Sequence, residues 1–424
     1  MARQEILFDP ADIPPAVKYE KLFEHLPKLN EQLPKTGRHP VNRNCLLKAL
    51  IYKALRRLPF LSDLTFELNN NPSVSKALGF HPLLPAPSVE RFSSFVRDTN
   101  NQELKTVEHQ LVQTLIELQV ISGKVIAPDS CPIVAPLKEN NLKTSIADRF
   151  DKTKRPAGDR DARLGVMIHY PNPFKKKVQY FWGYRNHIIS DAHTELPICE
   201  TTQQAQVHEV EIAKKLILEA KDNFKLNIEA VIADANFDAE HFLRFIIKDL
   251  KAMPIIPRNP RNEQPKGYQI KGNTILCEAG LPMYRKGRMR PKRTGILYCQ
   301  YTCPIHYDKH VRPQYIICPL YHPKFLEGKG CNVLIRLEPS IREQIDYGTK
   351  QFKELYTKRT SVERVFSRLL AVAMQQPTVR GYNANKNHAT IAHLAVLLVA
   401  LSAQKSGHPD KIRFVKSFVP CFLN

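Results

Sequence analysis

Glu363 stands among arginines at helical spacing, which makes it the first candidate for chemistry in this sequence. It lies four residues after Arg359 and seven before Leu370, so a helix through this stretch would place all three on one stripe. Arg364 and Arg368 flank the same carboxylate, and apolar residues fill the neighbouring faces. Taken alone, Glu363 is a surface carboxylate paired with the arginine one turn earlier, which is a common and weak interaction.

Two aspartates further upstream each follow a short strand-like run. Residues 124–127 form a β-branched run that ends before Asp129, and residues 228–233 form an apolar run that ends at Asp234. A carboxylate just after a strand can be presented at a sheet edge, although a turn-capping role is the commoner interpretation of any single Asp. Asp238 would suit a helix N-cap, so Asp234 is our candidate and Asp238 its substitute.

Three carboxylates brought together by a fold would repel one another unless cations neutralised them. Asp129, Asp234 and Glu363 offer hard oxygen ligands, which suit Mg²⁺ or Mn²⁺. Two such ions can activate a hydroxyl on one side of a phosphate and stabilise the leaving oxygen on the other. These residues therefore predict phosphoryl transfer with two divalent ions.

The spacing resembles that of the DDE transposases of bacterial insertion sequences with a Tyr-x2-Arg-x3-Glu-x6-Lys signature. Tyr356, Arg359 and Glu363 match it, whereas Leu370 occupies the position of its lysine. The stretch GYRNH at 183–187 is similar to that family's Gly-Tyr-Arg/Lys-x-His strand, and residues 379–401 are similar to its C-terminal end. The resemblance covers most of the chain, from about residue 42 to about residue 401.

The resemblance implies a role for each matching residue. Asp129 would bridge both ions, and Asp234 and Glu363 would each hold one. Arg359 would hold a backbone phosphate, and Tyr356 would contact DNA near the cleaved end. Leu370 cannot hold a phosphate, so either Arg368 or Lys358 substitutes for the missing lysine or the activity is reduced. The candidate DNA contacts on this helix are Arg368, Lys358 and Arg364.

The resemblance also implies an α/β fold, with a ribonuclease-H-like mixed sheet flanked by helices. The expected function is a transposase that cuts and joins double-stranded DNA at its element's terminal inverted repeats and in target DNA, as a homodimer on paired ends. One alternative, favoured by Leu370, is a transposase-derived DNA-binding protein without strand transfer. The other is a metal-dependent nuclease that does not join ends.

Composition points to the same partner. The net charge of +22 implies a polyanion, and nucleic acid is the usual one. The longest apolar run, 389–403, is interrupted by polar residues and predicts a buried core helix, with no membrane partner. Nine cysteines in no disulfide framework predict a reduced, cytoplasmic protein.

Helical periodicity, strand-like runs and charge divide the chain into five expected parts. The first is helical, and its basic faces favour a DNA-binding region over a plain helical cap. The parts are the helical region 1–120, the first part of the catalytic domain 121–258, a basic insertion 259–344, the Glu363 helix with the C-terminal core helix 345–405, and a basic tail 406–424.

The insertion carries two further candidate sites. Its basic run favours phosphate binding over a merely solvated surface, through Arg285, Lys286, Arg288, Arg290, Lys292 and Arg293. Its thiols can hold a structural zinc ion, although buried thiols in β-structure are the favoured interpretation. The candidate zinc ligands are Cys277, Cys299, Cys303 and Cys318, with Cys331, His306, His310 and His322 nearby.

Overall fold

The structure is a computed structural model that describes residues 15–30, 41–172, 175–259, 267–272, 274–292, 295–307 and 317–418. The chain folds as two units, each described here by itself. The first comprises Met1–Ala233, Leu250–Ile255 and Lys353–Asn424. The second comprises Asp234–Asp249 and Ile256–Phe352.

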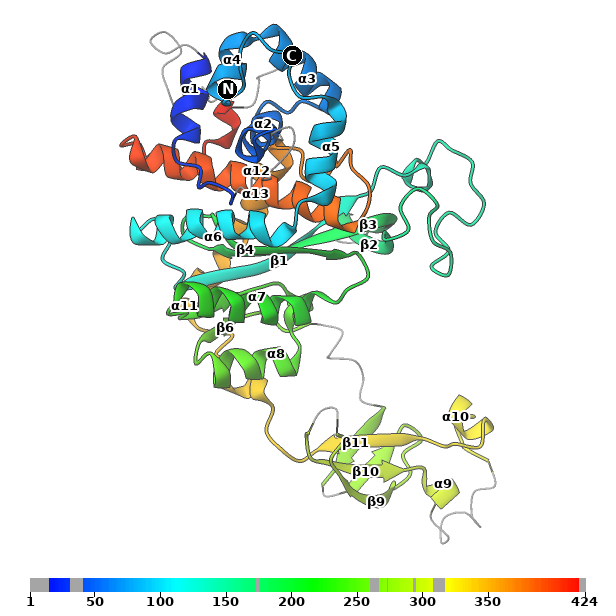
Figure 1. The fold of residues 1–424 in the computed structure, drawn as a ribbon. Coiled ribbons are helices and arrows are strands. Elements are labelled where there is room, and N and C mark those ends of the chain that lie inside the picture. Colours follow the sequence, from blue (N-terminus) through cyan, green and yellow to red (C-terminus); the bar gives the residue numbers. More distant parts are fainter. Residues whose placement is uncertain are drawn as a thin grey trace. The chain divides into compact units, whose positions relative to one another are not determined.

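The first unit is built on a mixed sheet (Figure 1). Strands β1 (Val125–Val134), β3 (Lys175–Asp191) and β4 (Pro197–Gln204) are antiparallel neighbours, and β2 (Arg163–Asn172) pairs with the first part of β3. On the other side of β1, β5 (Ala230–Ile232) and then β6 (Met253–Ile255) run parallel to it. Strands β4, β3, β1, β5 and β6 form the predicted ribonuclease-H-like mixed sheet, to which β2 adds a sixth strand, so the fold prediction is confirmed.

Helices cover both faces of this sheet. In Figure 1, α6 and α13 lie on one face and α7 on the other. The helices of this unit are α1 (Pro15–Phe23), α2 (Arg43–Leu55), α3 (Leu61–Asn70), α4 (Pro72–Ala77), α5 (Val89–Asp98), α6 (Asn101–Glu117), α7 (Glu209–Phe224), α12 (Thr360–Ala371) and α13 (Tyr382–Lys405). Helix α11 (Lys350–Thr357) spans the boundary between the units. The N-terminal helices belong to the same unit as the sheet, because α13 packs against α2, α5 and α6.

Helix α13 is the buried core helix that the sequence predicts. By length and composition alone it would be long and apolar enough to cross a membrane, but 89% of its apolar window is buried inside the protein. A helix that is apolar on all sides is stabilised by burial on all sides, which is how α13 lies between the N-terminal helices and the sheet.

The sequence predicts that the strand ends before Asp129, but β1 continues through this residue to Val134. Proline has no N–H to donate to a neighbouring strand, and Pro128 is therefore the reason to expect that the strand ends there. Ala135 donates its N–H to β3, whereas Val134 donates its N–H to a loop outside the sheet. Along a strand, successive N–H groups point to opposite edges, so the nitrogen of Pro128, six residues before Val134, also points away from β3. The proline therefore removes no hydrogen bond between β1 and β3.

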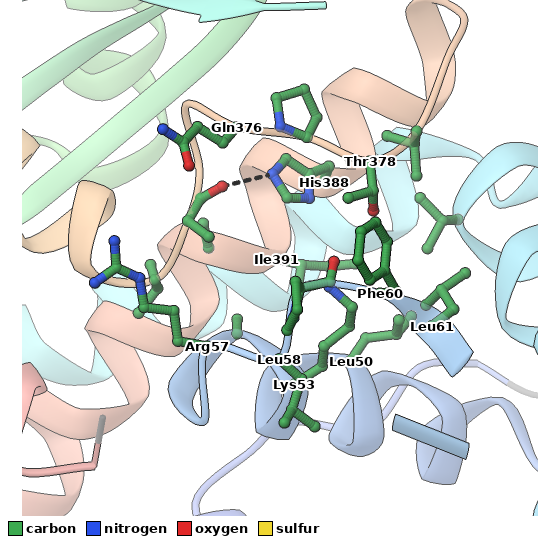
Figure 2. A pocket seen from close by; sticks show the side chains of 18 residues that line it. Leu50, Lys53, Arg57, Leu58, Phe60, Leu61, Gln376, Thr378, His388 and Ile391 are labelled. Atoms are coloured by element: carbon green, nitrogen blue, oxygen red, sulfur yellow. Dashed lines mark hydrogen bonds between the residues drawn. The ribbon is translucent and has the colours of Figure 1, made fainter. Parts of the chain in front are cut away.

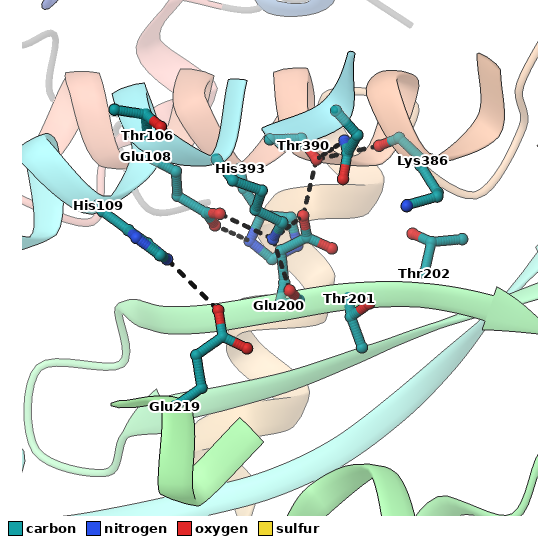
Figure 3. Close-up of polar contacts among 12 residues, drawn as sticks. Thr106, Glu108, His109, Glu200, Thr201, Thr202, Glu219, Lys386, Thr390 and His393 are labelled. Atoms are coloured by element: carbon teal, nitrogen blue, oxygen red, sulfur yellow. Dashed lines mark hydrogen bonds and ion pairs between the residues drawn. The ribbon is translucent and has the colours of Figure 1, made fainter. Parts of the chain in front are cut away.

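A buried ionic network joins α6, β4 and α13 (Figure 3). Lys105 of α6 donates to Glu108 over 2.8 Å and forms an ion pair with Glu200 of β4. Glu200 also accepts a hydrogen bond of 2.7 Å from Thr390 of α13. Figure 3 shows Glu108 and Glu200 converging beside His393, and burial lowers the pKa of that imidazole to about 4, so it is neutral. The network fixes α6 and α13 on the sheet through charges that are excluded from water.

The second unit contains the insertion. Strands β9 (Tyr284–Met289), β10 (Tyr298–Thr302) and β11 (Asn332–Arg336) form one antiparallel sheet, and β7 (Tyr268–Lys271) pairs with β8 (Thr274–Cys277). Its α-helices are α8 (Glu240–Arg244), α9 (Pro304–Tyr307) and α10 (Pro323–Leu326). Glu240 at the start of α8 binds Arg336 of β11 through two hydrogen bonds of 2.6 and 2.8 Å, which ties this helix to the insertion.

Candidate active site

Asp129, Arg359 and Glu363 are brought together in the first unit. Arg359 donates from Nη2 to Asp129 Oδ2 over 3.0 Å, and its Nη1 lies 3.5 Å from Glu363 Oε1. The second oxygen of Asp129 accepts the backbone N–H of Ser130 at 2.8 Å. The Glu363 side chain is 63% exposed, whereas those of Asp129 and Arg359 are each 15% exposed. One guanidinium therefore lies between two carboxylates that are 234 residues apart (363 − 129) in the chain.

Arg359 occupies this position because the helix is interrupted in front of it. The predicted single helix is in fact two, since α11 ends at Thr357 and α12 begins at Thr360. Lys358 and Arg359 donate their N–H groups to the carbonyls three residues earlier, at 3.0 and 2.9 Å, which tightens the chain at the junction. Tyr356 remains half-buried at the end of α11.

In this structure Asp129 and Glu363 engage the guanidinium of Arg359, and its contact with a DNA phosphate stays a prediction. Its Nε and Nη1 atoms are buried, and neither has a hydrogen-bond partner among the described residues. Buried guanidinium donors without partners are costly, and here they are held by the attraction of Asp129 and Glu363. The geometry thus favours a positive charge between these two acids.

Glu195 anchors α12 to the turn between β3 and β4. Arg368 donates to the Glu195 carbonyl at 2.8 Å and also to its carboxylate, and Arg364 donates to the other carboxylate oxygen. Arg368 is only 7% exposed and its donors are used inside the protein, so this structure does not favour its predicted contact with DNA. Lys358, another predicted DNA contact, lies with its Nζ 3.0 Å from His193 Nδ1, in the same turn as Glu195.

We expect Glu195→Gln to lower the free energy of unfolding by about 2–4 kcal/mol at pH 7, because it leaves the buried Arg368 without a carboxylate. Burial raises the pKa of Glu195, but the hydrogen bonds from Arg364 and Arg368 outweigh it and hold the pKa below its usual value. A lowered carboxyl pKa stabilises the fold above the unfolded pKa of about 4.3, and this contribution is lost as the pH falls through the folded pKa. Urea unfolding at pH 7 and pH 3 measures both effects.

The matched control is Arg364→Gln, which removes the exposed partner of the same carboxylate. It should cost less than 1 kcal/mol, as is typical of exposed ion pairs. A difference between wild type and Glu195→Gln that stays constant from pH 7 to pH 3 would contradict the assignment.

The opposite face of β1 carries a second set of polar contacts. Ser130 points toward α7 and donates to Glu209 over 2.8 Å, and Arg185 of β3 donates to the same carboxylate over 2.6 Å. Because successive strand residues face opposite sides, this contact fixes Asp129 toward α12. Arg185 belongs to the stretch at 183–187, so that motif supports the position of Asp129 indirectly.

Asp234 is the first residue of the second unit, two residues after β5 ends. Its Oδ1 accepts the N–H of Asn236 at 2.9 Å and caps a short 3-10 turn. Asp238 does not cap a helix, since the N-cap of α8 is Ala239. It is buried and accepts a hydrogen bond of 2.7 Å from Arg342, so it has a structural role and is a poor substitute for Asp234.

The basic run of the insertion lies on and just after β9. Its described cations are exposed, and they are Arg285, Lys286, Arg288, Arg290 and Lys292. Arg290 pairs with Glu338 at 2.6 Å, whereas Lys286 lies over the ring of Tyr307. Arg293 lies outside the described residues.

The zinc site of the insertion stays a prediction, because its cysteines lie in two apolar clusters and Cys331 packs against both of them. Cys277 lies in one apolar cluster, Cys303 and Cys318 lie in another, and the sulfur of Cys299 accepts a hydrogen bond from Arg285. All four thiols are buried, but only Cys277 and Cys299 lie in β-strands. His310 lies outside the described residues.

The group with metal-ligand spacing among the described residues is elsewhere, at His109, Cys199 and Glu219. Burial raises the pKa of the Cys199 thiol well above its usual value.

Comparisons with known proteins add two findings. The family model described as "Transposase DDE domain" matches residues 150–399, and the one described as "Transposase domain (DUF772)" matches residues 7–98. No curated protein matches the chain. Among solved structures, a cryo-EM structure of the piggyBac transposase synaptic complex with hairpin DNA matches at 13% identity and a TM-score of 0.38, over 96% of this chain and 80% of that chain.

Proposed function

We propose that this chain, which belongs to the transposases with a DDE domain, cuts and joins DNA with divalent ions held by Asp129, Asp234 and Glu363. A DDE transposase is an enzyme that cleaves and transfers DNA, and its family uses divalent metal ions. The observation that carries our assignment of residues is the guanidinium of Arg359 between Asp129 and Glu363.

The residues fit a divalent cation. Asp129 and Glu363 supply hard carboxylate oxygens, and a positive group already lies between them. Asp234 is part of the proposal as the second acid that the sequence predicts. It follows β5, which pairs in parallel with β1, the strand that carries Asp129.

Bound divalent ions would make a water or hydroxyl a stronger nucleophile and would stabilise charge on the phosphate oxygens. The chain's own residues would supply position. Asp129 is fixed by β1 and by the N–H of Ser130, whereas Glu363 is exposed and can turn toward the substrate. Cations bound by Asp129 and Glu363 would neutralise both carboxylates, and Arg359 would then be released from Asp129 and could donate to a backbone phosphate.

DNA is the partner that we propose, as element ends and target, with two copies of the chain on paired ends. The net charge of +22 and the exposed cations of β9 support it. The ions that suit these ligands are two Mg²⁺ or Mn²⁺. A nuclease that cuts without joining would use the same residues, so joining must be tested directly.

The test is a joining assay with a duplex that ends at the cut terminal repeat and a supercoiled target plasmid. We expect joined product in Mg²⁺ or Mn²⁺ and none with a chelator, because the carboxylates cannot stabilise the phosphate without ions. The control omits only the terminal repeat and should give no product. Efficient cutting of uncut ends without any joining would favour the nuclease instead.

A further inference from the structure

A hollow of about 330 Å³ opens beside α12, on the stripe that carries Glu363. Two cations from distant parts of the chain reach it, Arg57 after α2 and Lys416 near the C-terminus, and both are exposed. Among the residues that the structure describes, no carboxylate lines it. The remaining lining residues are Ser367, Leu370, Ala371, Ala373, Gln375 and Gln376.

Two turns of the same kind contribute residues to this hollow, one after α2 and one after α12. Arg57, two residues after α2, is in the left-handed region at φ 54°, and Ala373, two residues after α12, is there at φ 60°. In each turn the next N–H donates to a carbonyl five residues earlier, Leu58 to Lys53 at 3.0 Å and Met374 to Leu369 at 3.1 Å. Glycine usually fills such a position, so a long cation there is a departure from the common pattern.

Arg57 and Gln376 line this hollow and also the pocket next to it. Figure 2 shows the adjoining apolar pocket, and in it the guanidinium of Arg57 and the amide of Gln376 lie on the same side, away from Leu50 and Leu61. Leu370 is 41% exposed and adds an apolar wall. The hollow therefore combines two positive charges with amide and hydroxyl groups and no negative charge, which is chemistry for an anion.

The distance from Glu363 to this hollow, measured along α12, matches the spacing of phosphates along a DNA strand. Ser367 and Leu370 lie four and seven residues after Glu363, which corresponds to about 6 and about 10 Å along a helix. Duplex DNA advances about 3.4 Å per nucleotide, so a phosphate in the hollow would belong to a linkage about two to three nucleotides from the cut.

We propose that this hollow binds one backbone phosphate of the element end, with Arg57 and Lys416 as its cationic donors. The proposal rests on the proposed function. Leu370 cannot supply a charge there, and Arg368 is buried against Glu195, so the two cations reach the site from outside α12. The ligand class is a phosphodiester of DNA.

The experiment measures binding of an end duplex by the full chain as a function of salt, in Ca²⁺. We expect Arg57→Gln/Lys416→Gln to bind about tenfold more weakly at fixed salt. The steepness of log K against log salt should fall by about 1, because one phosphate is no longer neutralised and its counterion is no longer released on binding. Adding Leu370→Lys to this double variant should restore about one unit of slope, since it returns a cation to the same hollow.

The matched control is Lys215→Gln/Lys225→Gln, which removes two exposed charges, one in α7 and one directly after it, on the other face of the sheet. Lys225 is also left-handed, at φ 52°, so backbone strain is matched as well. This control should keep the wild-type slope. A single neutral methylphosphonate two to three nucleotides from the cut should weaken wild type but not weaken the Arg57→Gln/Lys416→Gln variant further.

Equal slopes for wild type and Arg57→Gln/Lys416→Gln, with no response to Leu370→Lys, would overturn the proposal. Cleavage by the wild type in Mg²⁺ separates this result from failure of the proposed function. If the wild type cuts and the slopes are equal, only the hollow is misassigned. If the wild type does not cut but the slope falls, the hollow stands and the assignment of the carboxylates fails.

Discussion

A Glu363→Gln variant should cleave the element end about 10³-fold more slowly than wild type and bind it equally well. Metal ions contribute several kcal/mol of transition-state charge stabilisation, and each 1.36 kcal/mol changes the rate tenfold. A carboxamide keeps the shape of the side chain but loses the charge that holds the ion. Single-turnover cleavage in Mg²⁺ measures the rate, and fluorescence anisotropy in Ca²⁺ measures binding.

Exposure makes this variant a clean test. The Glu363 side chain is 63% exposed, so the substitution leaves the core intact and should not shift thermal unfolding. Glu117→Gln is the matched control, since it neutralises another exposed carboxylate, on α6. Equal cleavage by Glu363→Gln and wild type would remove Glu363 from the site. Loss of DNA binding together with cleavage would give the residue a structural role instead.

Local patterns in the sequence predict the elements of the site well. Helical spacing alone predicts that the side chains of Arg359 and Glu363 are neighbours, and Arg359 Nη1 lies 3.5 Å from Glu363 Oε1. Gly183 could be marked as special because it stands in a strand, where glycine is unfavourable without a reason. The structure supplies that reason: a Cβ at this position would lie 2.1 Å from the carbonyl oxygen of Ile133 in β1.

Long-range partners could not be predicted in the same way. Arg368 carries a positive charge on a basic helix, and only the fold shows that Glu195, 173 residues away, encloses it. The break before α12 was missed because helical spacing continues through it without a proline or glycine. The proline before Asp129 predicts a strand end at this position. Whether a proline interrupts a strand depends on which edge its nitrogen faces, and only the pairing of β1 with its neighbours decides that.

One missed feature did leave a signal in the sequence. Leu104, Glu108, Leu111 and Leu115 follow one another at spacings of three and four, so a carboxylate stands on the apolar stripe of α6. A charge at such a position is buried and requires a partner. Lys105 is that partner, and with Glu200 it completes the buried network of the first unit.

We expect Lys105→Met to lower the free energy of unfolding by about 3–5 kcal/mol, because it leaves two carboxylates buried without their cation. Methionine matches the length of the lysine stem, so packing is largely kept. Urea unfolding at pH 8 measures the loss. The triple variant Lys105→Met/Glu108→Gln/Glu200→Gln is the control, and it should recover most of the stability because it buries no ions.

The same loss should depend on pH with a defined sign. Burial raises the pKa of Glu108 to about 7 even with Lys105 in place, whereas Lys105 outweighs burial at Glu200 and holds its pKa below the usual value. Without the lysine both carboxyl pKa values must rise, so the folded variant binds protons that the unfolded chain releases above about pH 4.5. Its stability therefore falls as the pH rises, and the difference from wild type should be smaller at pH 5 than at pH 8. A difference that is the same at both pH values would mean that these carboxylates reach water once the lysine is gone, and that the network is not a sealed part of the core.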